Sequence, residues 1–129
     1  MNYKNILVID DEKDIRDSIS GILDDEGYLS DAVKNSQEAL SKITDNTYNV
    51  IILDVWLNDS ELDGMQLLKE IKKVDLEIPV IIISGHGNIE IAVDAIKNGA
   101  YEFIEKPFSS ERLLLTVKRS IETSLFKFE

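Results

Sequence analysis

The sequence has no cysteine and few basic residues. Without cysteine in its 129 residues, disulfides, thiol nucleophiles and zinc–thiolate sites are excluded. Lysine and arginine total 14 against 25 aspartate and glutamate, a net charge of −11 that argues against nucleic-acid binding. No apolar run approaches the roughly eighteen residues of a membrane span, and the N-terminus lacks a signal-peptide layout. We therefore expect a cytoplasmic protein that does not enter the membrane.

Apolar residues are sufficient for one folded domain, residues 1–129. They make up 43% of the chain, an ordinary fraction for a globular protein. Short apolar segments predict β-strands at residues 5–9, 29–33, 50–53, 80–83 and 101–104. The strongest segments are continuously apolar, which is typical of parallel strands covered on both faces.

Segments with helical spacing of apolar residues lie between the predicted strands and after the last one. Asparagine, aspartate or serine precedes three of them, and glycine follows two, as expected at helix starts and stops. The five stripes contain Ile15, Ile19, Ile22 and Leu23; Ala39, Leu40 and Ile43; Leu67, Leu68 and Ile71; Ile89, Ala92, Val93 and Ile96; and Leu113, Leu114, Val117 and Ile121. Strict alternation of strand and helix predicts a doubly wound α/β fold with a parallel sheet.

Polar residues stand where the predicted strands end, which is where functional groups gather in such sheets. Asp10 and Asp11 follow the first strand, Asp54 the third, Ser84 the fourth, and Lys106 comes after the fifth. Clustered carboxylates repel one another, and Mg²⁺ is a hard cation that suits one or two of them. A carboxylate beside Mg²⁺ and a lysine ammonium is equipped to accept a phosphoryl group.

Each of these features has a structural explanation when taken alone. Acids at a helix start interact favourably with the helix dipole. Asp54 is consistent with a simple strand end, Ser84-Gly85 with a turn, and Lys106-Pro107 with an exposed loop. Their occurrence together, in this order and each at a strand end, favours a phosphoryl-transfer site.

These residues resemble the receiver domains of bacterial response regulators along essentially the whole chain, from segment 6–11 to segment 106–108. Segments 83–88 and 95–100 are most similar to regulators of the nitrogen-regulation family. The resemblance implies a five-stranded parallel sheet of flavodoxin-like order 2-1-3-4-5. It also implies a signalling switch, not an enzyme of metabolism, that receives a phosphoryl group from a sensor histidine kinase.

The resemblance assigns a role to each site residue. Asp54 is the phosphoacceptor, and Asp10 and Asp11 form the acidic metal pair. Asp54 and the backbone carbonyl of Trp56 complete the Mg²⁺ ligands. Lys106 and Ser84 stabilise the phosphoryl group, Ser84 and Phe103 act as switch residues, and the Lys106-Pro107 peptide bond is cis.

Two departures from the family pattern concern the loop before the third predicted helix and the switch aromatic. Asp63-Gly64 lies two residues further from Asp54 than in many receivers, and segment 57–62 has no proline. We expect this longer loop to be mobile. The switch aromatic is Phe103 rather than tyrosine, so a signal that needs the tyrosine hydroxyl is lost.

Other functions fit the residues less well. A haloacid-dehalogenase-like phosphatase requires a second aspartate two residues after its nucleophile, and this chain has Trp56 two residues after Asp54. A flavodoxin-type carrier requires a phosphate-binding loop rich in serine, threonine and glycine after the first strand. This chain has Asp10-Asp11-Glu12 there, which would repel phosphate. A pseudo-receiver that acts only in docking remains the alternative, against which the complete acid set argues. His86, the only histidine, lies between glycines and is interpreted as a solvent-facing loop residue.

The resemblance also predicts partners beyond the kinase. Regulators of this family usually continue into further domains, so the chain is expected to be the N-terminal part of a longer regulator with a C-terminal effector domain. Leu125, Phe126 and Phe128 extend apolar character past the fifth stripe, which favours a linker there. We expect homodimers to form through the face made by the fourth helix, fifth strand and fifth helix, with no nucleic acid bound by this domain.

Overall fold

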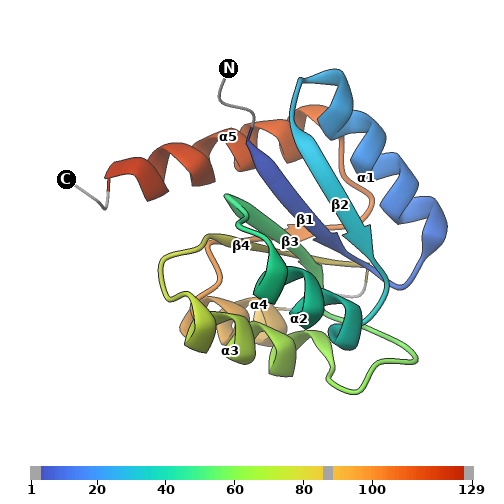
Figure 1. Cartoon of the computed structure of the whole chain (residues 1–129), viewed down its shortest axis with the longest axis vertical. Helices are drawn as coiled ribbons and strands as arrows, with labels where there is room; N and C mark the ends of the chain where they lie inside the picture. The colour runs from blue at the N-terminus through green and yellow to red at the C-terminus, as the bar shows by residue number, and fades with distance from the viewer. Residues whose placement is uncertain (1–3, 86–88, 127–129) are drawn as a thin grey trace.

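The computed structural model describes residues 4–85 and 89–126; His86 and Phe128 lie outside these ranges. Five strands alternate with five helices along the described chain (Figure 1). The strands are β1 (Asn5–Ile9), β2 (Leu29–Val33), β3 (Val50–Asp54), β4 (Val80–Ser84) and β5 (Glu102–Glu105). The helices are α1 (Lys13–Asp25), α2 (Ser36–Asp45), α3 (Gly64–Val74), α4 (Ile89–Lys97) and α5 (Ser110–Phe126). The predicted α/β fold is confirmed.

All strand pairs of the sheet are parallel, and the strand order is β2-β1-β3-β4-β5, as predicted. β1 and β3 are neighbours, with Ile9 paired to Leu53 at their carboxyl ends. The strand order reverses at β1, so the ends of β1 and β3 flank the switch point where such sheets carry their sites.

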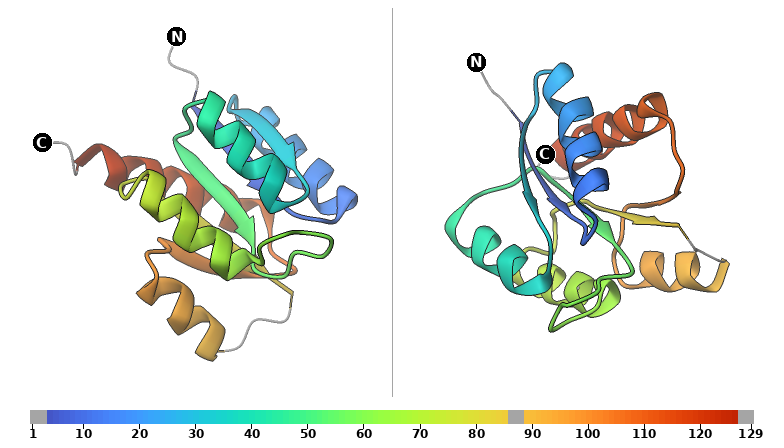
Figure 2. Two further views of the ribbon diagram at one scale, coloured as in Figure 1. Left: turned by 60° about the horizontal axis from the view of Figure 1, so that its bottom comes forward. Right: turned by 90° about the vertical axis from the view of Figure 1, so that its right-hand side faces the viewer.

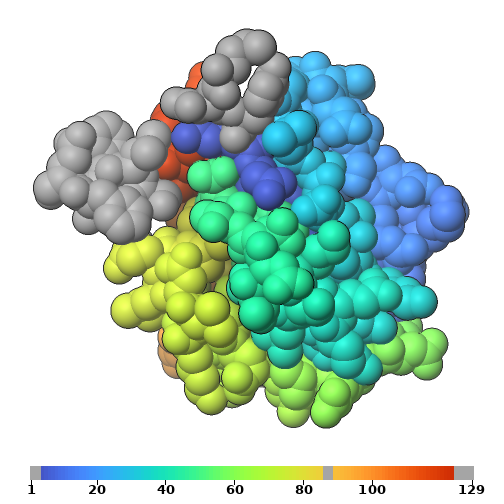
Figure 3. All heavy atoms as spheres, viewed as in Figure 1, coloured from blue at the N-terminus to red at the C-terminus, as the bar shows by residue number. Residues whose placement is uncertain are grey.

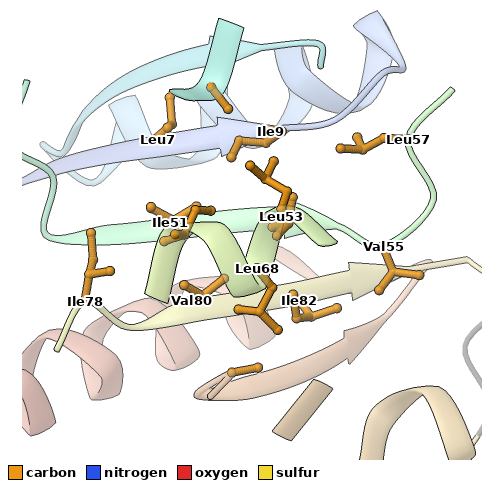
Figure 4. Packing of buried hydrophobic residues seen from close by; sticks show 14 of the residues in the cluster. Leu7, Ile9, Ile51, Leu53, Val55, Leu57, Leu68, Ile78, Val80 and Ile82 are labelled. Atoms are coloured by element: carbon orange, nitrogen blue, oxygen red, sulfur yellow. The ribbon is translucent and has the colours of Figure 1, made fainter. Parts of the chain in front are cut away.

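Helices cover both faces of the sheet, which explains why the strongest strand segments, those of the central strands, are continuously apolar (Figure 2). β3 and β4 are buried along their whole length. One core cluster packs α2, α3 and α4 against one face, and Figure 4 shows part of it around Leu53 and Leu68. The other cluster packs α1 and α5 against the opposite face through residues such as Leu23 and Val117.

The helix boundaries follow the expected capping signals. Asn35 and Asp63 are the N-caps of α2 and α3 and accept hydrogen bonds from the backbone N–H groups of Glu38 and Gln66. Gly27 and Gly99, predicted to end α1 and α4, have φ angles of 87° and 101°, which glycine adopts without strain.

Two sequence expectations about α4 and α5 need correction. The predicted stripe on α4 is not its buried face: Ile89, Val93 and Ile96 are exposed, while Ala95 is buried. α4 is apolar on more than one side, so periodicity alone did not select the face against the sheet. α5 extends to Phe126, so the apolar residues expected beyond the helix belong in part to its last turn. No helix within the described ranges combines the length and apolarity needed to cross a membrane.

Candidate functional site

The carboxyl ends of β1 and β3 bring Asp10 and Asp54 together. Ile9 pairs with Leu53. The residues that follow them, Asp10 and Asp54, therefore lie at the same edge of the sheet. Both residues are buried, with 0% and 3% exposure. Two buried carboxylates at one edge carry a desolvation cost that neighbouring groups must offset.

Lys106 supplies a positive charge to both carboxylates. Its Nζ donates hydrogen bonds to Asp10 Oδ2 at 3.0 Å and to Asp54 Oδ2 at 3.2 Å. The Lys106 backbone N–H donates to the Ser84 carbonyl oxygen at 2.8 Å, which fixes the start of the loop after β5. The Lys106-Pro107 peptide bond is cis, as predicted. The lysine therefore bridges the two aspartates from the neighbouring strands.

The pKa values of this group reflect burial opposed by hydrogen bonds. Burial raises the pKa of Asp54 to about 6, and the charge of Asp10 adds to the rise; the Trp56 N–H and Lys106 oppose it. Burial lowers the pKa of Lys106, but the hydrogen bond to Asp10 and the charges of Asp54 and Asp10 outweigh it, so the net pKa is raised. At neutral pH the pair is therefore an ionised carboxylate beside an ammonium.

An acidic cluster adjoins the bridged pair. Carboxylate oxygens of Asp10, Asp11 and Glu12 lie within 4.8 Å of one another. The Glu12 N–H donates to Asp10 Oδ1 at 2.9 Å, so the start of α1 orients the Asp10 carboxylate. Asp10, Asp11 and Asp54 carry more negative charge than Lys106 balances. Clustered oxygen donors with excess negative charge fit a hard divalent cation such as Mg²⁺.

The other predicted residues lie on the elements that follow, from the end of β3 to β5. The Trp56 N–H donates to Asp54 Oδ1 at 3.1 Å, and its side chain is 51% exposed at the rim of the site. Ser84 is fully buried at the end of β4, one residue beyond the Ile83 that pairs with Asp54. Phe103 lies one strand further, on β5, where it lines a hollow of about 1060 Å³ between α4 and α5.

Sequence reasoning gave three residues of the site no role in it. Glu12 contributes its carboxylate to the acidic cluster, and its place directly after Asp10-Asp11 was a usable signal. Arg16 Nη1 donates to the Asp10 carbonyl oxygen at 2.9 Å. Asn58 binds Asp11 from the loop after β3. Neither Arg16 nor Asn58 follows from spacing, since the loop conformation decides which groups meet.

Residues 6–118 match the response regulator receiver domain family. The chain belongs to this family. The match runs from the second residue of β1 to about the middle of α5 and includes every residue that was assigned to the site. Receiver domains of response regulators are generally not enzymes.

Individual relatives place the receiver domain near regulators of nitrogen metabolism, as predicted. It is 51% identical over 92% of its length to the nitrogen assimilation regulatory protein NtrX of Azorhizobium caulinodans, of which it spans 26%. The crystal structure of the receiver domain of NtrX from Brucella abortus is 54% identical, with a TM-score of 0.89 over 92% of this chain and 98% of that one. The solution structure of the beryllofluoride-activated NtrC4 receiver domain dimer is 48% identical, with a TM-score of 0.87 over 93% and 98%.

Proposed function

We propose that Asp54 accepts a phosphoryl group from a histidine of a sensor kinase, and that this modification switches the domain between two conformations. The observation that carries the proposal is the Lys106 ammonium, which joins Asp10 and Asp54 at the switch point of the parallel sheet. The arrangement gives a buried nucleophile, a fixed cation and a neighbouring acidic cluster at one point, which is the set that phosphoryl transfer to a carboxylate requires.

The transfer exchanges one bond for another. An Asp54 carboxylate oxygen bonds to phosphorus while the bond from phosphorus to the kinase imidazole nitrogen breaks, and the electron pair stays on that nitrogen. Asp54 acts in its ionised form, which a pKa of about 6 makes the main form at neutral pH. Lys106 holds its proton throughout and balances charge on the phosphoryl oxygens. The domain thereby catalyses only its own modification and its reversal by water.

Mg²⁺ is the cation that this donor set fits, with Asp10, Asp11, Asp54 and the Trp56 carbonyl as its protein ligands. When bound, it supplies further positive charge to the transferring group. Ser84, buried at the end of β4, donates its hydroxyl hydrogen to a phosphoryl oxygen.

Output follows from movement of the switch residues. The pull of the phosphoryl group on Ser84 leaves space into which Phe103 turns, and this biases the surface of α4, β5 and α5 between two packings. The chain spans only 26% of the length of the Azorhizobium regulator. We therefore propose that residues 1–129 act in the cytoplasm as the N-terminal receiver of a longer transcriptional regulator and control its effector domain.

Intact mass tests the proposed chemistry. Incubation with acetyl phosphate and Mg²⁺ should add one phosphoryl group to the wild-type chain and to Asp59→Ala and Asp63→Ala, which remove nearby exposed acids. Asp54→Ala should show no added mass. A phosphorylated Asp54→Ala protein would refute the assignment, and an unmodified wild type that still folds would favour a docking module instead.

A further inference from the structure

The segment 57–62, which forms most of the loop between β3 and α3, makes contacts at several points. Its first residue, Leu57, is buried, and Figure 4 shows its side chain directed toward Ile9. Asp59 has a φ of 51°, the left-handed conformation that turns the loop back. Hydrogen bonds join this segment to two other parts of the chain, the acidic cluster and the start of α2.

One of these partners is the acidic cluster. Asn58 Nδ2 donates to Asp11 Oδ2 at 2.9 Å, and the Asn58 backbone N–H donates to the same oxygen at 3.2 Å. A single residue thus offers two N–H groups to one carboxylate oxygen from 47 positions along the chain. Because both donors use Oδ2, Asn58 does not occupy the other oxygen, Oδ1.

We propose that Asn58 is a positioning residue for the Mg²⁺ site, acting through Asp11. This inference rests on the proposed function, since it takes Asp11 as a metal ligand. Asp11 is only partly buried and stands between two other acids, Asp10 and Glu12, so repulsion favours its turning to solvent. Two N–H donors hold its carboxylate in the cluster, and partners of this kind orient ligating carboxylates in metal sites.

The second partner of the loop is the start of α2. The Ser36 N–H donates to Ser60 Oγ at 2.9 Å, and the Leu62 N–H donates to Ser36 Oγ at 3.0 Å. The Glu61 N–H donates to the Gln37 side-chain oxygen at 3.2 Å. In Figures 1 and 3 the green loop lies beside the teal helix α2. The loop therefore links the metal ligand Asp11 to the N-terminus of α2.

This link makes metal binding and loop order depend on each other. If the ordered loop increases the affinity for Mg²⁺ by some factor, bound Mg²⁺ must increase the equilibrium constant for loop ordering by the same factor, because such couplings are reciprocal. Amide hydrogen exchange at Glu61 and Leu62, whose N–H groups reach α2, reports on loop order separately from phosphorylation.

The test measures Mg²⁺ binding to the 129-residue chain by calorimetry, with exchange followed by NMR. Asn58→Ala should raise the Kd for Mg²⁺ by about tenfold. This is the lower end of the range for substitutions of residues that orient a metal ligand, because the backbone N–H of residue 58 still donates to Asp11. Mg²⁺ should slow exchange at Glu61 and Leu62 in the wild type and much less in Asn58→Ala. Asn46→Ala, which removes an exposed amide bonded only within its own turn to Lys42, should change neither.

Asp11→Ala distinguishes the role of Asp11 as a metal ligand from the role of Asn58 in positioning it. Loss of Mg²⁺ binding in Asp11→Ala, with a wild-type Kd in Asn58→Ala, would overturn the positioning role and leave the proposed metal site intact. Wild-type Mg²⁺ affinity in Asp11→Ala would overturn the metal assignment of Asp11 and the role of Asn58 with it. Equal urea unfolding of Asn58→Ala and the wild type in EDTA is expected, because the effect lies in the cation site and not in the core.

Discussion

At the scale of single residues, Asp54 combines burial with hydrogen bonds that favour its charge. Its carboxyl group is almost fully buried, yet the Trp56 N–H and Lys106 both donate to it. Burial is the larger influence and leaves the pKa of Asp54 raised to about 6. For phosphoryl transfer, Asp54 is therefore a nucleophile that is ionised at neutral pH but only partly solvated.

The raised pKa of Asp54 predicts a pH dependence of stability. The folded value of about 6 exceeds the ordinary 3.8, so the folded protein binds this proton more tightly than the unfolded chain does. The free energy of unfolding should therefore fall as pH rises between these values, by up to about 3 kcal/mol for a two-unit difference. Above about pH 6 the loss from this group is complete.

Urea unfolding in EDTA at a series of pH values checks this dependence. Asp54→Asn removes the titrating group at constant size, so its stability should fall less steeply than that of the wild type between about pH 4 and pH 6. Parallel curves for the two proteins would show that Asp54 titrates without a raised pKa.

At the scale of elements, the sequence predicted the strands and the placement of the candidate site residues more fully than the loops. Continuous apolar runs located β3 and β4, and the polar residues that close them, Asp54 and Ser84, proved to be their last residues. Sheet topology then brings distant strand ends together, so Asp10 and Asp54 were predictable as neighbours. The partners of Asn58 were not, because they depend on a loop path that no periodicity encodes.

The junction of β3 and α3 requires glycine at position 64. A Cβ at Gly64 would lie 2.5 Å from Val55 Cα and 2.6 Å from the Val55 carbonyl oxygen, with the Asp54 carbonyl oxygen closer still. Backbone atoms cannot avoid the clash by changing rotamer as a side chain can. Gly64→Ala should therefore shift the end of β3 and lower the free energy of unfolding by about 1–3 kcal/mol.

Gly21→Ala is the matched control for the Gly64 substitution. Gly21 lies within α1 and a Cβ there meets no atom within 4 Å, so alanine should stabilise the helix by about 0.5–1 kcal/mol. Urea unfolding measures both changes. Equal stability of Gly64→Ala and the wild type would show that α3 moves aside at little cost.

At the scale of the whole molecule, the exposed apolar side of α4 forms part of the proposed switch surface. Ile89, Val93 and Ile96 are exposed there at 82%, 45% and 48%. Arg112 lies 4.0 Å from Glu102, so these two charges of the surface already face each other within one chain. Any dimer through this face must therefore draw on the apolar residues of α4 as well as on charge.

Light scattering across concentration tests the dimer. Beryllofluoride with Mg²⁺, a mimic of the phosphoryl group, should raise the average mass of the wild type, and Ile96→Ser should weaken this rise severalfold. Leu29→Ser, an exposed residue on β2 at the opposite edge of the sheet, is the control and should dimerise like the wild type. An unchanged mass with the mimic would exclude activation through dimerisation while leaving Asp54 as the acceptor.

The location of the phosphoryl group tests the central claim most directly. Reduction of the phosphorylated chain with borohydride converts an aspartyl phosphate to homoserine, and peptide mass spectrometry then identifies the altered position. We predict that the change occurs at Asp54 alone and depends on Mg²⁺. A modification at Asp10, Asp11 or Asp59, or on a residue other than aspartate, would contradict the account.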